Sequence, residues 1–250
     1  MPIRDNRNIR KVQPHIVRNL KQNVVKKPNT HQNSPVNIND RTYGESKKIW
    51  NDEVVYIIGG GPSLKGFDWS QLEGKKVIAI NRAFEVMPNA DVLYWTDSRF
   101  YRWFKEGIDK FSGLKFTCRE FNGKPSDLIL LKPNSAMNLD MRPSFISHGN
   151  NSGYGAINLA VKLGAKKIYL LGYDMNSFPG QSHWHSGYES THNDSIYVKM
   201  IKYFDSIPNE LKKLDVEIFN ANLKSQLTVF RRCSVEDAIY NRAYDPFRNI

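Results

Sequence analysis

Val54-Val55-Tyr56-Ile57-Ile58-Gly59-Gly60-Gly61-Pro62-Ser63-Leu64 is the stretch on which the fold of this chain depends. Its first five residues are apolar and suited to β structure, which predicts a buried strand over 54–58. Three glycines then predict a sharp turn. Pro62 fits the first turn of a helix, because its missing N–H costs nothing there. Strand, glycine turn and helix start in this order predict the first unit of a parallel α/β sheet.

The glycine turn also predicts a place for an anion. Without Cβ atoms, the N–H groups of Gly59, Gly60 and Gly61 can approach a phosphate closely, and Ser63 can add a hydroxyl donor. The spacing is not Gly-x-Gly-x-x-Gly, because residue 64 is leucine, and it is not a Walker P-loop, because no Gly-Lys-Ser/Thr follows. An ordinary turn from strand to helix, without a ligand, is the alternative.

The same pattern recurs along the rest of the chain. Apolar runs predict further strands at 76–80, 92–95, 114–118, 128–131, 167–171 and 216–219, and helical stretches are expected at 152–163, 196–214 and 235–244. Their alternation predicts an open, mostly parallel, Rossmann-like doubly wound sheet with helices on both faces. We expect residues 51–250 to form this single domain.

Residues 1–50 differ in composition from the remainder. They hold 11 Lys and Arg against 3 Asp and Glu, a net charge of +8 out of +11 for the whole chain, and they show no sustained helical or strand period. This predicts a basic, flexible N-terminal arm that could attract nucleic acid or an assembly partner, or that is simply solvated.

Polar residues follow three of the predicted strands. Asn81, Asp97 and Asp174 stand where ligands of such sheets bind, beyond the carboxyl ends of the strands. Asn81 can both donate to and accept from a nucleotide, and the two aspartates could bind a hydroxyl or, with phosphate, a divalent ion. Helix capping is the competing explanation for each of them.

A second helix start lies at Asn151-Ser152-Gly153. Asn151 or Ser152 can cap this helix, and Gly153 keeps its first turn open to an anion. Two facing helix N-termini, here and after Gly61, would suit a diphosphate or a phosphodiester.

The histidines gather after Asp174, in the segment around Ser182-His183-Trp184-His185. A zinc site would use His183 and His185 with His192 or Asp194. A general base is an alternative, since an imidazole can take a proton from an attacking hydroxyl, and Trp184 could stack on a sugar or base. A polar surface loop is the third reading.

These motifs together resemble a known group. Gly-x-Gly-Pro-Ser-Leu-Lys at 59–65, the asparagine after the second strand, the Ser-Gly helix start, Leu-Gly-Ala-Lys-Lys-Ile-Tyr-Leu at 163–170, Gly-Tyr-Asp at 172–174 and the His-Ser segment resemble the bacterial sialyltransferases of glycosyltransferase family 42. They are also similar to the 6-hydroxymethylpterin diphosphokinase-like proteins (domain of unknown function 115). The likeness covers about residues 53 to 230.

The sialyltransferase resemblance implies a role for each matched residue. A donor-nucleotide site is implied for Gly59, Gly61, Pro62, Ser63 and Asn81. Binding of the donor phosphate or carboxylate is implied for Ser152 and Gly153, the end of the central strand for Asp174, and the base that activates the acceptor hydroxyl for His185. The chain departs from the family's motifs in two places, with Gly60 in place of an asparagine and Asn151 in place of a threonine.

We therefore expect a nucleotide-dependent transferase, a sialyltransferase-like glycosyltransferase that moves a sugar from a nucleotide sugar to a glycan or small acceptor. Its catalytic residues would be His185, His183 and Asp174. The pterin-kinase resemblance implies the alternative, a diphosphokinase in which the glycine turn holds ATP and Asp97 and Asp174 bind Mg²⁺. A third hypothesis is a non-catalytic binding module of a phage or mobile element, docked by the basic arm. With no run of about 20 apolar residues, a cytoplasmic protein without a membrane span is expected.

Overall fold

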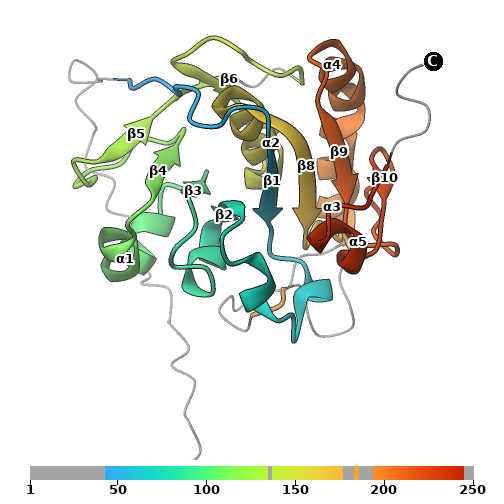
Figure 1. Cartoon of the computed structure of the whole chain (residues 1–250). Coiled ribbons are helices and arrows are strands. Elements are labelled where there is room, and N and C mark those ends of the chain that lie inside the picture. Colours follow the sequence, from blue (N-terminus) through green and yellow to red (C-terminus); the bar gives the residue numbers. More distant parts are fainter. Residues whose placement is uncertain (1–42, 135–136, 177–182, 186–193, 245–250) are drawn as a thin grey trace, which may run out of the picture.

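The computed structural model describes residues 43–134, 137–176, 183–185 and 194–244. Its main sheet has eight strands in the order β10-β9-β8-β1-β2-β3-β4-β5, and every neighbouring pair is parallel (Figure 1). The strands are β1 (Glu53–Ile58), β2 (Lys76–Ile80), β3 (Val92–Trp95), β4 (Leu114–Thr117), β5 (Leu128–Leu130), β8 (Ala165–Leu171), β9 (Glu217–Asn220) and β10 (Arg231–Arg232). The predicted α/β class with a mostly parallel sheet is confirmed.

The helices and a second small sheet lie between these strands. The helices are α1 (Phe100–Lys110), α2 (Ser152–Leu163), α3 (Asp194–Ile201), α4 (Ile207–Lys213) and α5 (Val235–Ile239). Short 3₁₀ segments cover Pro62–Leu64, Trp69–Leu72, Asn81–Glu85 and Lys202–Ser206. Strands β6 (Lys132–Asn134) and β7 (Phe145–Ser147) pair in parallel apart from the main sheet.

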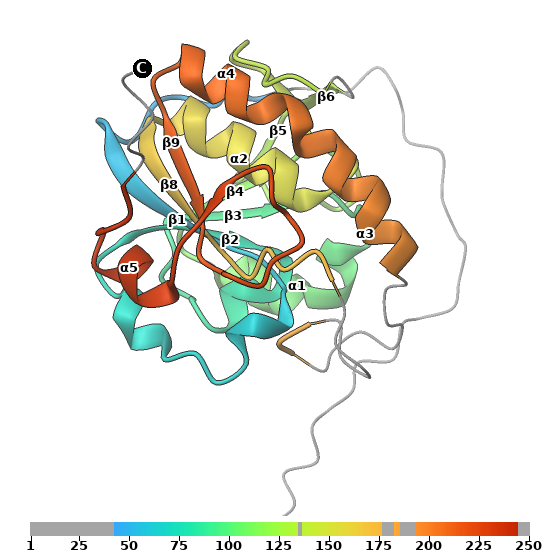
Figure 2. The ribbon, with the colours of Figure 1, turned by 90° about the vertical axis from the view of Figure 1, so that its right-hand side faces the viewer.

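Helices cover both faces of the sheet, as Figure 2 shows: α2, α3 and α4 lie on one face, and α1 and α5 lie on the other. The residues of the central strand β1 show why both faces need to be covered. Val55 and Ile57 belong to the core under α2 and α4, and Tyr56 and Ile58 belong to the core under α1 and α5. Side chains of a strand alternate between faces, so a continuous apolar run is buried on both sides.

Several elements differ from the sequence-based expectation. The single helix expected over 196–214 is α3, a 3₁₀ segment and α4 in succession, with Pro208 in the first turn of α4. No α-helix follows the glycine turn. The chain makes one 3₁₀ turn at Pro62–Leu64 and reaches Gly66, whose φ of +76° is left-handed and ends the turn. Helix α5 stops five residues earlier than expected, before the left-handed Asn241.

The domain begins earlier than residue 51. Gly44 donates a main-chain hydrogen bond to Leu130, and Ser46 donates one to Pro143. Trp50 is buried in the core and hydrogen-bonds to Leu163 at the end of α2. Residues 43–50, assigned to the arm from their charge, therefore pack on the sheet domain. The rest of the predicted arm lies outside the described residues.

Within the described ranges, no helix has the length and apolar character needed to cross a membrane.

Candidate functional site

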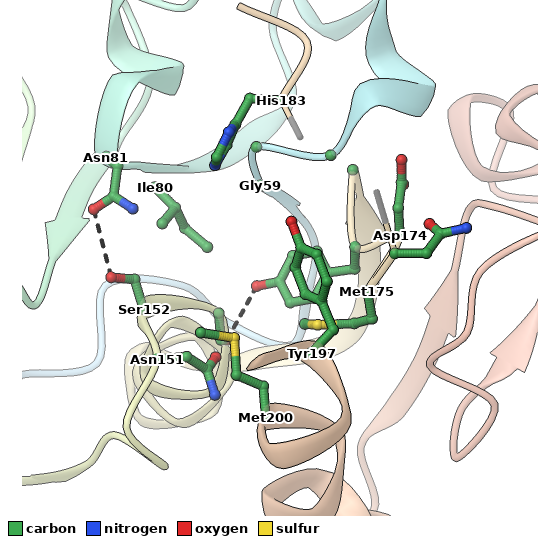
Figure 3. Close-up of a pocket in the computed structure, with 16 residues that line it drawn as sticks. Gly59, Ile80, Asn81, Asn151, Ser152, Asp174, Met175, His183, Tyr197 and Met200 are labelled. Atoms are coloured by element: carbon green, nitrogen blue, oxygen red, sulfur yellow. Dashed lines mark hydrogen bonds between the residues drawn. The ribbon is translucent and has the colours of Figure 1, made fainter. Parts of the chain in front are cut away.

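A pocket opens beyond the carboxyl ends of β1, β2 and β8. Strand β1 is the point where the strand order reverses, since the chain goes from β1 to β2 on one side and later adds β8 on the other. In such a sheet, the connections that leave the two strands at the reversal lie on opposite faces and leave a crevice at this point. The pocket is lined by Gly59, Gly60, Gly61, Ile80, Asn81, Asn151, Ser152, Gly153, Gly172, Tyr173, Asp174, Met175, Asn176, His183, Tyr197 and Met200 (Figure 3).

Most of the predicted site residues meet in this pocket. The glycine turn, Asn81, the Asn-Ser-Gly helix start, Asp174 and His183 are spread along the chain between residues 59 and 183, and they line one cavity. Of the described residues that were predicted for the site, Pro62, Ser63, Asp97 and His185 do not line it.

The N-terminus of α2 forms one wall. Asn151 caps the helix by accepting the Tyr154 N–H at 2.7 Å, so the predicted cap is present. The Ser152 hydroxyl lies 2.8 Å from the Thr96 hydroxyl, at the end of β3, and 3.4 Å from the amide oxygen of Asn81, at the end of β2. The first N–H groups of a helix have no acceptor within it, and they carry partial positive charge. This wall therefore favours a negatively charged ligand.

The glycine turn is held by the end of β8. Gly59 donates its N–H to Leu171, and Gly61 donates to Gly172, each at 2.8 Å. A Cβ on Gly61 would lie 2.6 Å from the Gly172 oxygen and 2.5 Å from the Asp174 carboxyl carbon. The glycines are needed for this close approach of two strand ends. Two of the N–H groups expected to face a phosphate therefore bond to the protein instead.

Asp174 follows the end of β8 by three residues and is buried beside this turn. Its carboxylate accepts the Ser63 N–H at 2.7 Å, the Ser63 hydroxyl at 2.6 Å and the Asn222 amide at 2.8 Å. Asp97 is exposed and pairs with Arg99 at 2.7 Å. Asp97 and Asp174 thus have separate partners. Among the described residues no group of three His, Cys, Asp or Glu side chains could hold a metal ion.

The histidine segment docks on the glycine turn through Trp184. Its main-chain N–H donates to Gly60 at 3.0 Å, and its indole N–H donates to Gly59 at 3.1 Å. The indole ring packs against Trp69, with ring centroids 5.4 Å apart. This anchoring places His183 over Gly60, where an added Cβ would lie 2.9 Å from the imidazole ring. Trp184 thus serves as the anchor of the segment.

The two histidines differ in their surroundings. His183 lines the pocket and stacks on His185, with ring centroids 5.1 Å apart. The Nδ1 atom of His185 lies 3.4 Å from the Arg82 guanidinium. Burial, the Arg82 cation and His183 lower the pKa of His185 to about 3. His185 is neutral near pH 7 and is a weak base. His192, the third zinc ligand considered above, lies outside the described residues.

Sequence reasoning missed the apolar part of the pocket, which consists of Met175, Tyr197 and Met200. Tyr197 and Met200 are three residues apart on α3 and so share a helix face. This spacing was the one available signal that both residues face the same way. The same spacing is also expected of core-facing residues in the long helix that the sequence predicted.

Comparison with known proteins adds no assignment: no protein-family model and no curated protein matches the chain.

Proposed function

We propose that the pocket at the ends of β1, β2 and β8 binds a nucleotide, and that the protein is a nucleotide-dependent transferase, most closely a glycosyltransferase. The supporting observation is the meeting of three features at the reversal of the strand order: the α2 N-terminus, the glycine turn and an imidazole. Nucleotides bind at this position in open parallel sheets, with phosphate at a helix N-terminus.

The α2 wall would hold the phosphate of the donor. Asn151 caps the helix, and the Ser152 hydroxyl is kept in place by Thr96 and Asn81. Negative charge grows on the phosphate as the donor bond breaks. A fixed helix N-terminus stabilises that charge without reorganising.

His183 would be the base. In the proposed step, its neutral ring takes the proton of an acceptor hydroxyl, and the hydroxyl oxygen forms a bond to the anomeric carbon. The bond from that carbon to the phosphate oxygen breaks, and the nucleotide leaves with the electron pair. The pocket position of His183 and the low pKa of His185 support His183 over His185 in this role.

The diphosphokinase alternative has less geometric support, because its two aspartates have separate partners, Arg99 for Asp97 and Ser63 with Asn222 for Asp174. The docking-module alternative depends on the basic arm, most of which lies outside the described residues.

The test is nucleotide binding by the full chain and by Ser152→Asp. The chain is titrated with CMP, CDP, UDP, GDP and ATP, with and without Mg²⁺, and binding is followed by calorimetry and thermal shift. A bound nucleotide raises the melting temperature by mass action. Ser152→Asp should lower affinity about tenfold or more, because a carboxylate repels phosphate, while an acidic residue at a helix start is itself favourable.

Ser206→Asp is the matched control, since Ser206 precedes the first residue of α4 and lies outside the pocket. It should bind like the unchanged chain. The proposal is overturned if none of the nucleotides binds, or if Ser152→Asp binds a nucleotide as tightly as the unchanged chain does.

A further inference from the structure

Arg82, just after the end of β2, makes contacts in three directions. Its Nε and Nη2 atoms lie 2.8 and 2.6 Å from the Glu85 carboxylate, and its guanidinium lies over the Phe104 ring, 5.2 Å from the ring centroid. The third contact is with His185, 103 residues further along the chain, whose Nδ1 atom lies 3.4 Å from Nη1. Only 17% of the Arg82 side chain is exposed. These contacts hold the planar guanidinium in one orientation, which an ordinary surface ion pair does not do.

The backbone at the end of β2 separates Arg82 from its neighbour Asn81. Asn81 has a φ of +50°, a left-handed conformation that is uncommon outside glycine and is often found at functional sites. Asn81 lines the pocket, and Arg82 does not. Arg82 is therefore linked to the site through His185 and not through the pocket itself.

The contact with Arg82 fixes the state of the His185 ring. An arginine side chain has only N–H donors and stays charged, so Arg82 donates and the Nδ1 atom of His185 accepts. The proton of the neutral imidazole is then on Nε2. A protonated His185 would direct a second N–H donor and a second positive charge at the guanidinium. The pKa of His185, lowered to about 3 by burial and then by the Arg82 cation, agrees with a neutral ring.

His185 in turn stacks on His183. Their ring centroids are 5.1 Å apart, and their planes differ by 22°. Two positive charges at this separation repel, so the pair takes up its protons in separate steps. His183 is the ring that lines the pocket, beside the glycine turn in Figure 3. A neutral His185 therefore leaves the first proton of the pair to His183.

We propose that Arg82 is a positioning residue for the base: it holds His185 as the neutral Nε2–H tautomer, so that the stacked pair takes its first proton on His183, at the pocket. This inference rests on the proposed function, in which His183 takes the proton of the acceptor hydroxyl. Arg82 acts through His185, and the contacts with Glu85 and Phe104 keep Arg82 in place.

The first test is ¹⁵N NMR of the histidine rings in the full chain, because the two nitrogen shifts report both the tautomer and the charge of an imidazole. Signals are assigned with His183→Gln and His185→Gln. In the unchanged chain, His185 should carry its proton on Nε2 and stay neutral from about pH 8 to about pH 5. Arg82→Met keeps the length of the side chain over Phe104 and removes the donor and the charge. In this variant both tautomers of His185 should appear, and the pair should take up its first proton about one pH unit higher or more.

Arg99→Met is the matched control. Arg99 likewise pairs with a carboxylate, that of Asp97 at 2.7 Å, and lies over an aromatic ring, that of Trp103 at 5.1 Å from the centroid. This variant should leave the spectra of His183 and His185 unchanged. The spectrum of the unchanged chain decides the assignment even if Arg82→Met does not fold, because a proton on Nδ1 of His185 would contradict it.

The second test is the pH dependence of single-turnover transfer. Protonation of the base lowers the rate on the acid side of the profile. Loss of the Arg82 cation favours proton uptake by the pair, so the acid limb of Arg82→Met should move up by about one pH unit. The rate at higher pH and the nucleotide affinity should stay near those of the unchanged chain. A merely structural role of Arg82 would instead lower the rate equally at every pH.

The outcomes separate this inference from the function on which it rests. The role of Arg82 is overturned, and the proposed function stands, if nucleotides bind and transfer occurs but Arg82→Met changes neither the tautomer nor the proton uptake of the pair. A proton on Nδ1 of His185, or an equal loss of rate at every pH, has the same meaning. If no nucleotide binds and no sugar is transferred, the proposed function fails, and the role of Arg82 in positioning a base fails with it.

Discussion

Asp174 and Ser63 join the ends of two adjacent parallel strands through a pair of hydrogen bonds. The carboxylate of Asp174, after β8, accepts the N–H of Ser63 at 2.7 Å and its hydroxyl at 2.6 Å, beside the turn after β1. This pair fixes the turn after β1 to the segment after β8, and Asp174 itself lines the pocket. The geometry of the site therefore depends on a carboxylate that acts on the protein itself.

Replacing that carboxylate should destabilise the fold. In Asp174→Asn, one carboxylate oxygen becomes an NH₂ group, so one of the three donors that now bond to Asp174 loses its acceptor. We expect this to lower the free energy of unfolding by about 1–3 kcal/mol. The melting temperature should fall by several degrees in thermal denaturation. Asp97→Asn is the control, because Asp97 is exposed and pairs with Arg99, and its effect should stay within about 0.5 kcal/mol. Equal effects of the two variants would contradict the structural role of Asp174.

Gly60 and Gly61 should differ in how well they tolerate an added side chain. In Gly61→Ala, the new Cβ meets the Gly172 oxygen at 2.6 Å, which is main chain and cannot move away cheaply. We expect a loss of about 1–3 kcal/mol or more in urea denaturation. In Gly60→Ala, the new Cβ meets only the His183 ring, at 2.9 Å. That variant should stay near the stability of the unchanged chain and lose transfer activity as the imidazole shifts. A Gly61→Ala protein as stable as Gly60→Ala would refute this account.

Replacement of His183 and replacement of His185 should have different effects on the transfer rate. His183→Gln should lower the transfer rate about 100-fold or more, the scale of general base catalysis, with nucleotide affinity unchanged. His185→Gln should have a smaller effect, because a group with a pKa of about 3 contributes little as a base. The measurement is single-turnover transfer from a nucleotide sugar of the base found in the titrations. Loss of turnover in His185→Gln alone would return the base role to His185, as the sequence resemblance implies.

His185 should also make stability depend on pH. In the unfolded chain a histidine takes up a proton near pH 6.5, whereas in the fold the pKa is about 3, so between these values the unfolded chain binds more protons. The free energy of unfolding should therefore fall as pH is lowered from about 7 to 5, above the range where carboxylates titrate. His185→Gln should flatten this slope in urea denaturation followed by tryptophan fluorescence. Equal slopes in the unchanged chain and in His185→Gln would show that the fold does not lower the pKa of His185.

The seven predicted strands are all present, and the central ones, β1, β2, β3 and β8, are short apolar runs that are buried on both faces. Helix α1 was missed. Its sequence is rich in aromatic and charged residues, contains Gly107, and has a non-helical residue at Phe104. Strand β10 has two residues and exists only through its pairing with β9, which no local pattern records.

The candidate site was predictable where its residues stand at strand or helix ends. Asn81 and Ser152 fall at the pocket because parallel strands end on one edge of the sheet, and a helix that leads back into the sheet begins there. The place of Tyr197 and Met200 in the pocket was not predictable, since it depends on how α3 packs against the rest of the domain.

The sequence by itself determined a parallel α/β sheet with polar strand ends, because apolar periodicity and glycine turns act over a few residues. Tertiary structure alone decided what those groups bond to. Gly59 and Gly61 donate to the end of β8, Asp174 accepts from Ser63, and His183 rather than His185 lines the pocket. These bonds join residues more than 100 positions apart. Their partners are selected by packing between strands, which the local sequence does not encode.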